Sequence, residues 1–395
     1  MPLTGSIKEL TAKYLGAIVQ LRHDLHSHPE LGYAEHDTSK LIAGQLTGLG
    51  IETRTGLAAT GVVGLIRGRG PGRTVLLRAD MDALPIQEDV DVPYRSKLDN
   101  RMHACGHDGH VAGLLGAAMV LNELRGQFNG NVKLVFQPAE ETEGGAARMI
   151  AEGVLEDPVV DAAFACHLWG SLGEGKVQLC PGPMMASPNT FRFTIHGRGG
   201  HGALPHLAVD PIPLAAQAIT FFQTIVSRRV NPLEPVVLTV SSIHSGEAIN
   251  VIPGTLEASG TVRTFNEALS QVIAREMENI LKGVTEAHGA TYSFEYHEHY
   301  PPLINHPGMT QLAAGAFAKV LGADHVNAAA RPCMAAEDFA YFAKAVPAAF
   351  ALVGIAKDEA NPMVHHQPRF QWDDKNLSVL TEGLAQIAVD FLGQS

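Results

Sequence analysis

Short β-branched runs alternate with helical runs through the first part of this chain, and this alternation limits the possible fold more than any other feature. The runs 61–68 and 73–80 are rich in valine and leucine and are separated by glycine and proline, which favours two adjacent strands joined by a turn. Further strands are expected over 131–141 and 161–170, and helices over 108–126 and 142–153. This pattern is typical of an α/β fold with a mixed, mostly parallel sheet that carries helices on both faces.

The middle of the chain has a different order of elements. Strands are expected over 190–197, 235–244, 255–265 and 290–298, and helices over 210–227 and 268–289. The order strand-helix-strand-strand-helix-strand is that of a ferredoxin-like α+β unit. We therefore expect a discontinuous α/β domain over 1–184 and 298–395, interrupted by an inserted α+β domain over 185–297.

The composition indicates a globular protein with a substantial interior. Hydrophobic residues make up 46% and charged residues 18% of the 395 residues. Because no apolar tract of about 18 residues occurs, we expect no membrane span. Residues 1–25 have the spacing of an amphipathic helix and lack the pattern of a secretory signal, which favours a cytoplasmic protein.

Charge and cysteine content exclude two further classes of protein. The formal net charge is −12, with 29 Lys and Arg against 41 Asp and Glu, which argues against a nucleic-acid partner. The cysteines at 105, 166, 180 and 333 do not make a disulfide framework in a chain of this length. Roles in a core or at a metal are expected for them instead.

The segment HACGHDGH, residues 103–110, concentrates side chains that can coordinate a metal. Cys105 and His107 are separated by one residue in a predicted loop, so both can face one ion. In open α/β sheets, ligands bind in the crevice beyond the carboxyl ends of the strands, where separate parts of the chain converge. Other candidates follow predicted strands or stand near the C-terminus: Asp80, Asp82, Glu140, Glu141, His167 and either His365 or His366.

The mixture of donor types indicates which metal would bind there. A thiolate, imidazoles and a carboxylate suit zinc or a similar first-row ion better than magnesium or calcium. A mixed ligand set with open positions is typical of a catalytic site. For each residue alone an alternative stays open, because His103, His107 and His110 can bond to local carbonyls and Cys105 can be a small buried side chain.

Glu140 and Glu141 need separate roles, because adjacent side chains at a strand end point to opposite sides. If Glu141 binds a metal, Glu140 can face a water molecule at that metal and take its proton, which requires a pKa near the working pH. The alternative is that both are solvated glutamates at the start of a helix, where negative charge is favoured.

Motifs of other enzyme classes are weak or missing. GRGGHG, residues 197–202, matches the dinucleotide fingerprint, but Pro205, Pro211 and Pro213 delay the helix that would hold a pyrophosphate. A G-x-S-x-G nucleophile elbow and the HExxH helix of zincin proteases do not occur in the sequence. The sequence thus disfavours nucleotide binding and serine hydrolysis.

A series of motifs occurs in order from residue 28 to residue 370. It comprises HPELGYAEHDTS, LRADMDALPIQE, MHACGHDGH, FQPAEE, CHLWG, GRGGHGALPH with DPI, INVIPG, GTVRTF, AEDFAYF and HHQPRF. This set resembles the metal-dependent N-acyl-amino-acid amidohydrolases, the group of hippurate hydrolase and the auxin-conjugate hydrolases. They belong to the wider superfamily of aminoacylases and glutamate-releasing carboxypeptidases. The resemblance covers essentially the whole chain.

The resemblance implies a site with two divalent ions per subunit, such as zinc, manganese, nickel or cobalt. His366 is preferred to His365 because the family's last ligand stands two residues before a proline, here Pro368. The implied ligands are Cys105, which would bridge the ions, with His107, Glu141, His167 and His366.

The resemblance also implies catalytic roles within the same set of motifs. Glu140 corresponds to the general base, which would take a proton from water and hand it to the leaving amine. Asp82 corresponds to the superfamily's orienting carboxylate, although Asp80 stands where the usual first histidine ligand is found. The residue that Asp82 orients is therefore left open.

The inserted domain, over 185–297, would contribute to catalysis and assembly. His201 resembles the residue that reaches a substrate carbonyl in the partner subunit's site and stabilises the oxyanion. Asn250 and Arg263 resemble clamps for the substrate's free α-carboxylate. The domain would pair with its twin to form a homodimer, with further pairing into a homotetramer left open. Hinge closure of such a lid is a property of some members.

The functional prediction is metal-dependent hydrolysis of the amide bond of an N-acyl-L-amino acid, such as a hippurate-like substrate, to a carboxylic acid and a free amino acid. Two alternatives stay open. The same scaffold can serve a dipeptidase or an N-acetyl-amino-acid deacetylase, and a metal- or peptide-binding protein can keep it without turnover. Glu140 beside the ligand set argues against the binding protein, because storage needs no base.

Overall fold

The computed structural model describes residues 3–142 and 144–394, which form two compact units. The first unit runs to residue 184 and also takes in residues 304–332 and those from 338 on, and the second comprises residues 185–303 and 333–337. Short strands β7 (Gly182–Met185) and β14 (Leu303–Asn305) lie where the chain passes from one unit to the other. The domain limits predicted from the sequence, and the role of the inserted part as a dimerisation domain, stay predictions.

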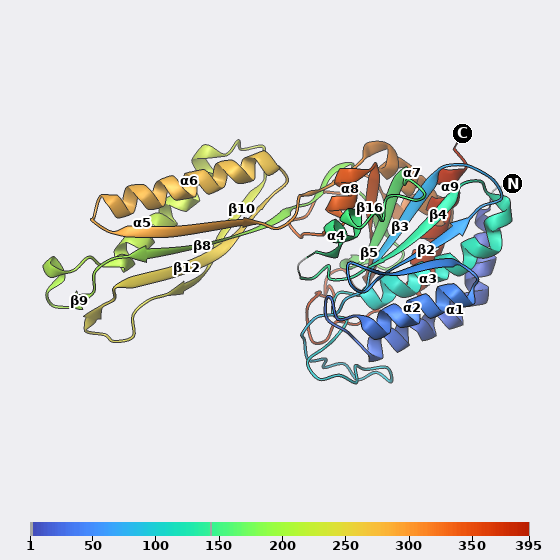
Figure 1. Ribbon diagram of the computed structural model, residues 1–395, viewed down its shortest axis with the longest axis horizontal. Coiled ribbons are helices and arrows are strands. Elements are labelled where there is room, and N and C mark those ends of the chain that lie inside the picture. The colour runs from blue at the N-terminus through green and yellow to red at the C-terminus, as the bar shows by residue number, and fades with distance from the viewer. Residues whose placement is uncertain (1–2, 143, 395) are drawn as a thin grey trace. The chain divides into compact units, whose positions relative to one another are not determined.

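A mixed sheet forms the centre of the first unit (Figure 1). Its strands are β1 (Glu52–Leu57), β2 (Gly61–Arg67), β3 (Thr74–Asp80), β4 (Asn131–Gln137), β5 (Ala162–Gly173), β6 (Val177–Gln178), β15 (Val326–Asn327) and β16 (Ala348–Ala356). They lie in the order β1-β2-β4-β3-β5-β16-β6-β15. The central neighbours β4, β3, β5 and β16 are parallel, whereas β2 is antiparallel to β1 and β4, and β6 to β16. The predicted fold class, α/β with a mostly parallel central sheet, is confirmed.

Helices cover this sheet on both faces. They are α1 (Thr4–Ser27), α2 (His36–Gly48), α3 (His107–Leu124), α4 (Gly145–Ala151), α7 (Pro307–Leu321), α8 (Ala340–Ala345) and α9 (Asn376–Leu392). α3 and α9 pack on the central strands, α1 packs on both helices, and α2 packs on β1 and β2. α4 and α8 touch each other and contact β4 and β16. Leu76 and Leu77 of β3 point to opposite sides and are both fully buried, so neither face is open to solvent there.

The neighbours of β2 differ from the sequence prediction. The runs 61–68 and 73–80 are predicted to lie side by side, but β4 stands between β2 and β3. The connection between β2 and β3 lies beside the turn that precedes β4. There the Gly68 N–H donates to the Gly130 carbonyl, and the Gly130 N–H donates to the Gly70 carbonyl. The glycine-rich turn therefore pairs with another turn of the chain, which a hairpin interpretation of the local sequence cannot reveal.

The strand predicted over 131–141 ends earlier, at Gln137, and the helix predicted over 142–153 begins later, at Gly145. Pro138 has no N–H for the ladder, and Ala139 has a positive φ of 57°, which lies outside the strand region. Glu140 and Glu141 consequently lie in the loop between β4 and α4.

The second unit has the predicted order of elements. They are β8 (Ser187–His196), α5 (Pro211–Thr224), β10 (Val236–His244), β12 (Thr255–Thr264), α6 (Glu267–Glu286) and β13 (Thr291–Glu298). The strands form an antiparallel sheet in the order β10-β12-β8-β13. β9 (Gly200–His201) and β11 (Val251–Ile252) form a separate two-stranded ribbon.

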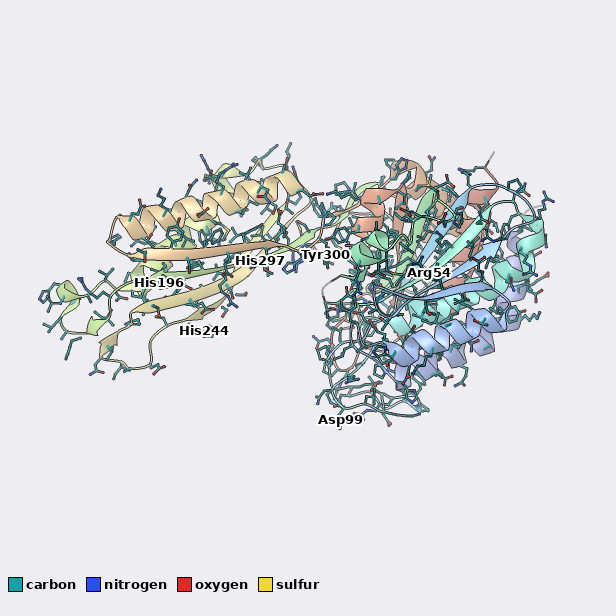
Figure 2. The ribbon with its side chains drawn as sticks, in the orientation of Figure 1. Arg54, Asp99, His196, His244, His297 and Tyr300 are labelled. Atoms are coloured by element: carbon teal, nitrogen blue, oxygen red, sulfur yellow. The ribbon has the colours of Figure 1, made fainter. Side chains whose placement is uncertain are left out.

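One face of the sheet in the second unit is apolar and the other is polar. Phe191 and Phe193 of β8 are buried in one cluster with residues of α5 and α6. The strand register places the exposed His196 on the opposite face, together with His244 of β10 and His297 of β13 (Figure 2). The alternation of buried and exposed residues along β8 thus determines which face the two helices cover.

In the part of the chain that the structure describes, no helix combines the length and the apolar character that crossing a bilayer requires.

Close packing between α7 and α9 predicts the effect of a small substitution. A Cβ at Gly383 of α9 would lie 2.2 Å from Cε1 of Phe317 in α7, whereas a Cβ at the exposed Gly315 of α7 would meet nothing within 4 Å. Gly383→Ala should destabilise the protein by about 1–3 kcal/mol because the core must shift. Gly315→Ala should stabilise it by up to about 1 kcal/mol through helix propensity. Calorimetric unfolding of both variants checks this, and equal shifts of the same sign would contradict it.

Candidate metal centre

The candidate site lies where the carboxyl ends of neighbouring parallel strands meet. β3 and β4 end side by side, with Asp80 paired to Gln137, and β5 lies on the other side of β3. The chain leaves β3 through Asp82 and leaves β4 through the loop with Glu140 and Glu141. α3 begins at His107, so Cys105 precedes its first turn at the same edge of the sheet. This topology explains why residues far apart in sequence converge there.

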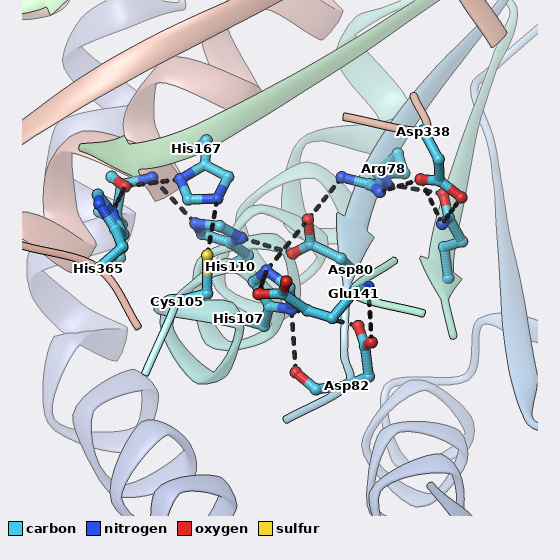
Figure 3. Close-up of polar contacts among 12 residues, drawn as sticks. Arg78, Asp80, Asp82, Cys105, His107, His110, Glu141, His167, Asp338 and His365 are labelled. Atoms are coloured by element: carbon cyan, nitrogen blue, oxygen red, sulfur yellow. Dashed lines mark hydrogen bonds and ion pairs between the residues drawn. The ribbon is translucent and has the colours of Figure 1, made fainter. Parts of the chain in front are cut away.

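The structure brings the five predicted metal ligands together in one cluster. Figure 3 labels four of them, Cys105, His107, Glu141 and His167. Sγ of Cys105 lies 3.4 Å from Nε2 of His167. Oε1 of Glu141 lies 3.0 Å from Nε2 of His366 and 4.0 Å from Nε2 of His107. The donor atoms of Cys105, His107 and His167 lie within 4.8 Å of one another, and so do those of Cys105, Glu141 and His366. These five side chains could hold a divalent cation between them.

His167 lies inside β5, within the range 161–170 over which a strand is predicted. β5 continues to Gly173 because it pairs with β16, and Leu352 stands opposite His167 in that ladder. The Nδ1–H of His167 donates to the Leu168 carbonyl at 2.6 Å. Nε2 therefore keeps its lone pair toward Cys105, as a metal ligand requires.

The two adjacent histidines near the C-terminus have different surroundings. His365 donates from Nε2 to the Leu168 carbonyl at 3.0 Å and packs against Trp169 and Phe370. His366 adopts a positive φ of 60°, and its ring faces Glu141. The preference for His366 over His365 agrees with this geometry.

Asp82 contacts two members of the cluster. The Nδ1–H of His107 donates to the Asp82 carbonyl at 2.9 Å, and the carboxylate lies 3.3 Å from the same nitrogen. Oδ2 of Asp82 accepts the backbone N–H of Glu141 at 3.0 Å. Asp82 thus fixes the ring of His107, with Nε2 facing the cluster, and also the backbone of the loop that carries Glu141.

His110 is excluded as a ligand by its hydrogen bonds. Its Nδ1 lies 2.5 Å from Oδ1 of Asp80, and its Nε2 accepts the backbone N–H of Leu168 at 2.9 Å. Both ring nitrogens are therefore used. Asp80 is bound in turn by Nη1 of Arg78 at 2.6 Å.

Arg78 and Asp338 form a buried support behind the cluster, which the sequence prediction missed. Nη2 of Arg78 lies 3.0 Å from Oδ1 of Asp338, and its Nε donates to Gln137 at 2.9 Å. Asp338 also accepts the backbone N–H of Ala146 at the start of α4. An arginine inside the apolar run TVLLRAD and an aspartate in AEDFAYF were the available signals, because a buried charge needs a partner.

Burial and nearby carboxylates shift the pKa of several members of the cluster. Burial, reinforced by Glu141 and Glu140, raises the pKa of the Cys105 thiol well above its usual value. Burial lowers the pKa of His167 well below its usual value. For His107 burial opposes the charged form, but the carboxylates of Asp80 and Asp82 prevail and raise its pKa to about 10. The surroundings of His107 are thus strongly electronegative.

The donor set fits a divalent cation. Nε2 of His107 is buried and has no hydrogen-bond partner among the described residues. It lies 3.7 Å from Oδ2 of Asp80 and 4.0 Å from Oε1 of Glu141, so a positive charge beside it would be favoured. Sulfur, nitrogen and oxygen donors together suit zinc, manganese, nickel or cobalt.

The predicted residues of the inserted part lie in the second unit. His201 of β9 pairs with Val251 of β11, and the Asn250 carbonyl accepts the N–H of Gly202 at 2.8 Å, so His201 and Asn250 are close together. Arg263 stands at the C-terminal end of β12, opposite Pro188 of β8. Its Nη1 is buried without a hydrogen-bond partner among the described residues.

Comparisons with known proteins found similar sequences and a similar solved structure. The model of peptidase family M20/M25/M40 matches residues 76–390. An N-acyl-L-amino acid amidohydrolase of Geobacillus stearothermophilus is 45% identical over 76% of this chain and 81% of its own length. The N-acetylcysteine deacetylase of Bacillus subtilis is 38% identical over 94% of this chain and 96% of its own. The solved structure of the Bacillus subtilis YXEP protein, described as a dinuclear metal-binding peptidase of the M20 family, is 34% identical with a TM-score of 0.84, covering 97% of this chain and 100% of that one.

Two cysteines of the first unit, the half-buried Cys105 and the buried Cys166, allow a matched test of the cluster. Cys105→Ala should lower the content of bound divalent metal, because its sulfur lies among the other donors. Cys166→Ala should leave the metal content as in the unsubstituted protein, because Cys166 belongs to the apolar core on the strand that carries His167. Plasma mass spectrometry of the purified proteins measures both. Equal metal content in the two variants would remove Cys105 from the ligand set.

Proposed function

Because the chain belongs to peptidase family M20/M25/M40, we propose that it hydrolyses the amide bond of N-acyl-L-amino acids and releases a carboxylic acid and a free amino acid. The protein is a hydrolase of amide bonds that depends on divalent metal. The observation that carries the proposal is the convergence of Cys105, His107, Glu141, His167 and His366. Nε2 of His107 is buried there and has no hydrogen-bond partner within residues 3–142 and 144–394.

The metal cluster and Glu140 have separate tasks in this proposal. Bound divalent cations supply Lewis acidity toward a carbonyl oxygen and make a nearby water molecule more acidic. Glu140 takes a proton from that water, whose oxygen attacks the amide carbon. Glu140 then gives the proton to the amide nitrogen as the carbon–nitrogen bond breaks. One carboxylate thus serves as base and then as acid.

The position of Glu140 supports this role. It is 8% exposed, and its carboxylate lies within 4.8 Å of the donor atoms of both His107 and Glu141. The backbone N–H of Glu141 is held by Asp82, so the two adjacent glutamates are constrained separately. Asp82 acts as a positioning residue for His107 and the Glu141 backbone.

The second unit supplies the substrate contacts in our proposal. His201 would stabilise the oxyanion at the active site of the partner subunit, which makes a homodimer necessary. Asn250 and Arg263 would bind the free α-carboxylate of the substrate. Nη1 of Arg263 is buried and has no hydrogen-bond partner in the part of the chain that the structure describes, which supports this assignment because such a guanidinium favours an anion. Further pairing of dimers into a tetramer is compatible with the same contacts.

The metal and the location are finer parts of the proposal. We propose two ions per subunit, which Cys105, His107, Glu141, His167 and His366 would hold, with zinc, manganese, nickel or cobalt as candidates. A small-molecule substrate, and neither nucleic acid nor membrane, is the expected partner. Cys105, Cys166, Cys180 and Cys333 are all free thiols, which supports a reducing, cytoplasmic location.

A second candidate function is removal of an N-acetyl group. The relative named N-acetylcysteine deacetylase covers nearly the whole chain and supports this alternative. The same machinery would then act on the smallest acyl group. A hydrolysis assay decides between hippurate-like substrates, deacetylation and dipeptidase activity. It offers benzoyl-, acetyl- and indoleacyl-amino acids and a dipeptide to the protein loaded with each metal in turn.

Adjacent glutamates give the sharpest test of the catalytic base. Glu140→Gln should lower kcat by about 10²- to 10⁴-fold, because the proton transfer is lost, while the metal content stays unchanged. Glu141→Gln should lower the metal content. Kinetics and plasma mass spectrometry on the same preparations separate the two roles. Loss of metal from Glu140→Gln would make Glu140 a ligand instead of the base.

If Arg263 binds the free carboxylate of the substrate, its loss should affect only substrates that carry this group. Arg263→Ala should raise KM for an N-acyl-amino acid by about tenfold or more, because a charge-assisted pair is lost. The same variant should not change KM for the corresponding N-acyl-amino-acid amide, which has no carboxylate. Arg192→Ala, on the exposed face of the same sheet, is the control and should behave as the unsubstituted protein. Equal effects on the acid and the amide would contradict the clamp.

A further inference from the structure

Glu35 is a buried carboxylate at a position where its side chain could have capped a helix. It is 0% exposed and stands at the N-cap of α2, yet its side chain does not cap that helix. Glu30 does so instead, because its Oε2 accepts the N–H groups of Asp37 at 3.0 Å and Thr38 at 2.8 Å. The carboxylate of Glu35 is therefore available for contacts elsewhere.

Those contacts lead to the loop of the proposed base. Oε1 of Glu35 accepts the backbone N–H of Ala139 at 2.9 Å, and Oε2 accepts the hydroxyl of Thr60 at 2.7 Å. Thr60 lies in the turn between β1 and β2, and it is 2% exposed. Three segments far apart in sequence thus meet at one carboxylate. Burying that group costs free energy unless both oxygens are bonded.

Ala139 is the residue directly before Glu140, and its backbone is constrained. Its φ of 57° lies in the left-handed region, which a side chain with a Cβ seldom adopts. Its carbonyl accepts the N–H of Gly144 at 3.0 Å, which closes the loop. The N–H of Ala139, the other backbone polar group of this residue, donates to Glu35.

The segment that carries Glu35 also packs closely on the same loop. A Cβ at Gly32 would lie 2.6 Å from Oγ1 of Thr142 and 3.1 Å from Cα of Ala139, so only glycine allows this approach. The N-terminal segment and the loop therefore form one packed structure.

We propose that Glu35 is a positioning residue that holds Ala139 in its left-handed conformation and thereby aims the side chain of Glu140. Asp82 holds the N–H of Glu141, and Glu35 holds the N–H of Ala139, so a different buried carboxylate orients the backbone on each side of the proposed base. The proposal rests on the proposed function through the role of Glu140. Neither contact partner of Glu35 is a proposed metal ligand, so its loss should affect catalysis without loss of metal.

Substitutions of Glu35 and Thr60 test the proposal. Glu35→Ala should lower kcat by about 10- to 100-fold with little change in KM or metal content, because the base is displaced from its working geometry. Glu35→Gln should keep kcat within about threefold, since its amide oxygen can accept the Ala139 N–H and its NH2 group can donate to Thr60. Thr60→Val should lower kcat by about three- to tenfold, and Thr60→Ser should restore it.

Glu30→Ala is the matched control. It removes the cap of α2 in the same segment and lowers stability, but it leaves the Ala139 bond intact, so kcat should not change. Amide hydrogen exchange of residues 137–142 in the metal-loaded protein gives a second readout. Exchange should be faster in Glu35→Ala and unchanged in Glu30→Ala. In an active protein, unaltered kcat in Glu35→Ala would overturn the proposal, as would Glu35→Gln with the same defect as Glu35→Ala.

The two readouts separate this inference from the proposed function. If the unsubstituted protein hydrolyses no N-acyl-amino acid, the proposed function fails, while faster exchange in Glu35→Ala alone would still support the positioning contact. If the protein is active and Glu140→Gln is inactive, but Glu35→Ala keeps full kcat, the inference about Glu35 fails and the proposed function stands.

Discussion

The first unit depends on one electrostatic constraint. At a buried edge of its sheet, the carboxylates and metal-binding donor atoms are more numerous than the hydrogen bonds and ion pairs of the protein can balance. Asp80, Asp82 and Glu141 surround His107, whose outward nitrogen has no partner among the described residues. Burial disfavours ionisation of the thiol of Cys105. A divalent cation resolves all of these demands together, because it binds the lone pairs and neutralises the charge.

Positioning by buried polar groups is the second feature of the structure. Arg78 bonds to Asp80 and to Asp338, and Asp338 bonds to the first turn of α4. Asp82 and Glu35 hold two backbone N–H groups of the loop between β4 and α4. Apart from the Arg78–Asp80 bond within β3, each bond joins a strand end or a helix start to a segment distant in sequence. The side chains of the cluster are thus oriented by a rigid frame rather than by the loops alone.

The sequence predicted much of this arrangement, for reasons that differ between residues. The spacing of apolar residues and the positions of turn residues revealed the helices and strands. The types of donor side chain at strand ends indicated the metal cluster. Local patterns did not reveal that β4 separates β2 from β3, because strand order depends on pairing between distant segments. They placed Glu140 at the end of a strand, whereas Pro138 and the positive φ of Ala139 put it in a loop. Arg78, Asp338 and Glu35 were missed because their importance lies in contacts that no spacing along the chain encodes.

The central claim is that a divalent metal is bound among the thiol, imidazole and carboxylate donors of one sheet edge. X-ray diffraction from crystals of the metal-loaded protein, recorded on both sides of the absorption edge of that metal, tests it most directly. The account predicts anomalous difference peaks between Cys105, His107, Glu141, His167 and His366. Fully occupied metal that gives its anomalous peaks elsewhere, with these five side chains free of it, would contradict the account.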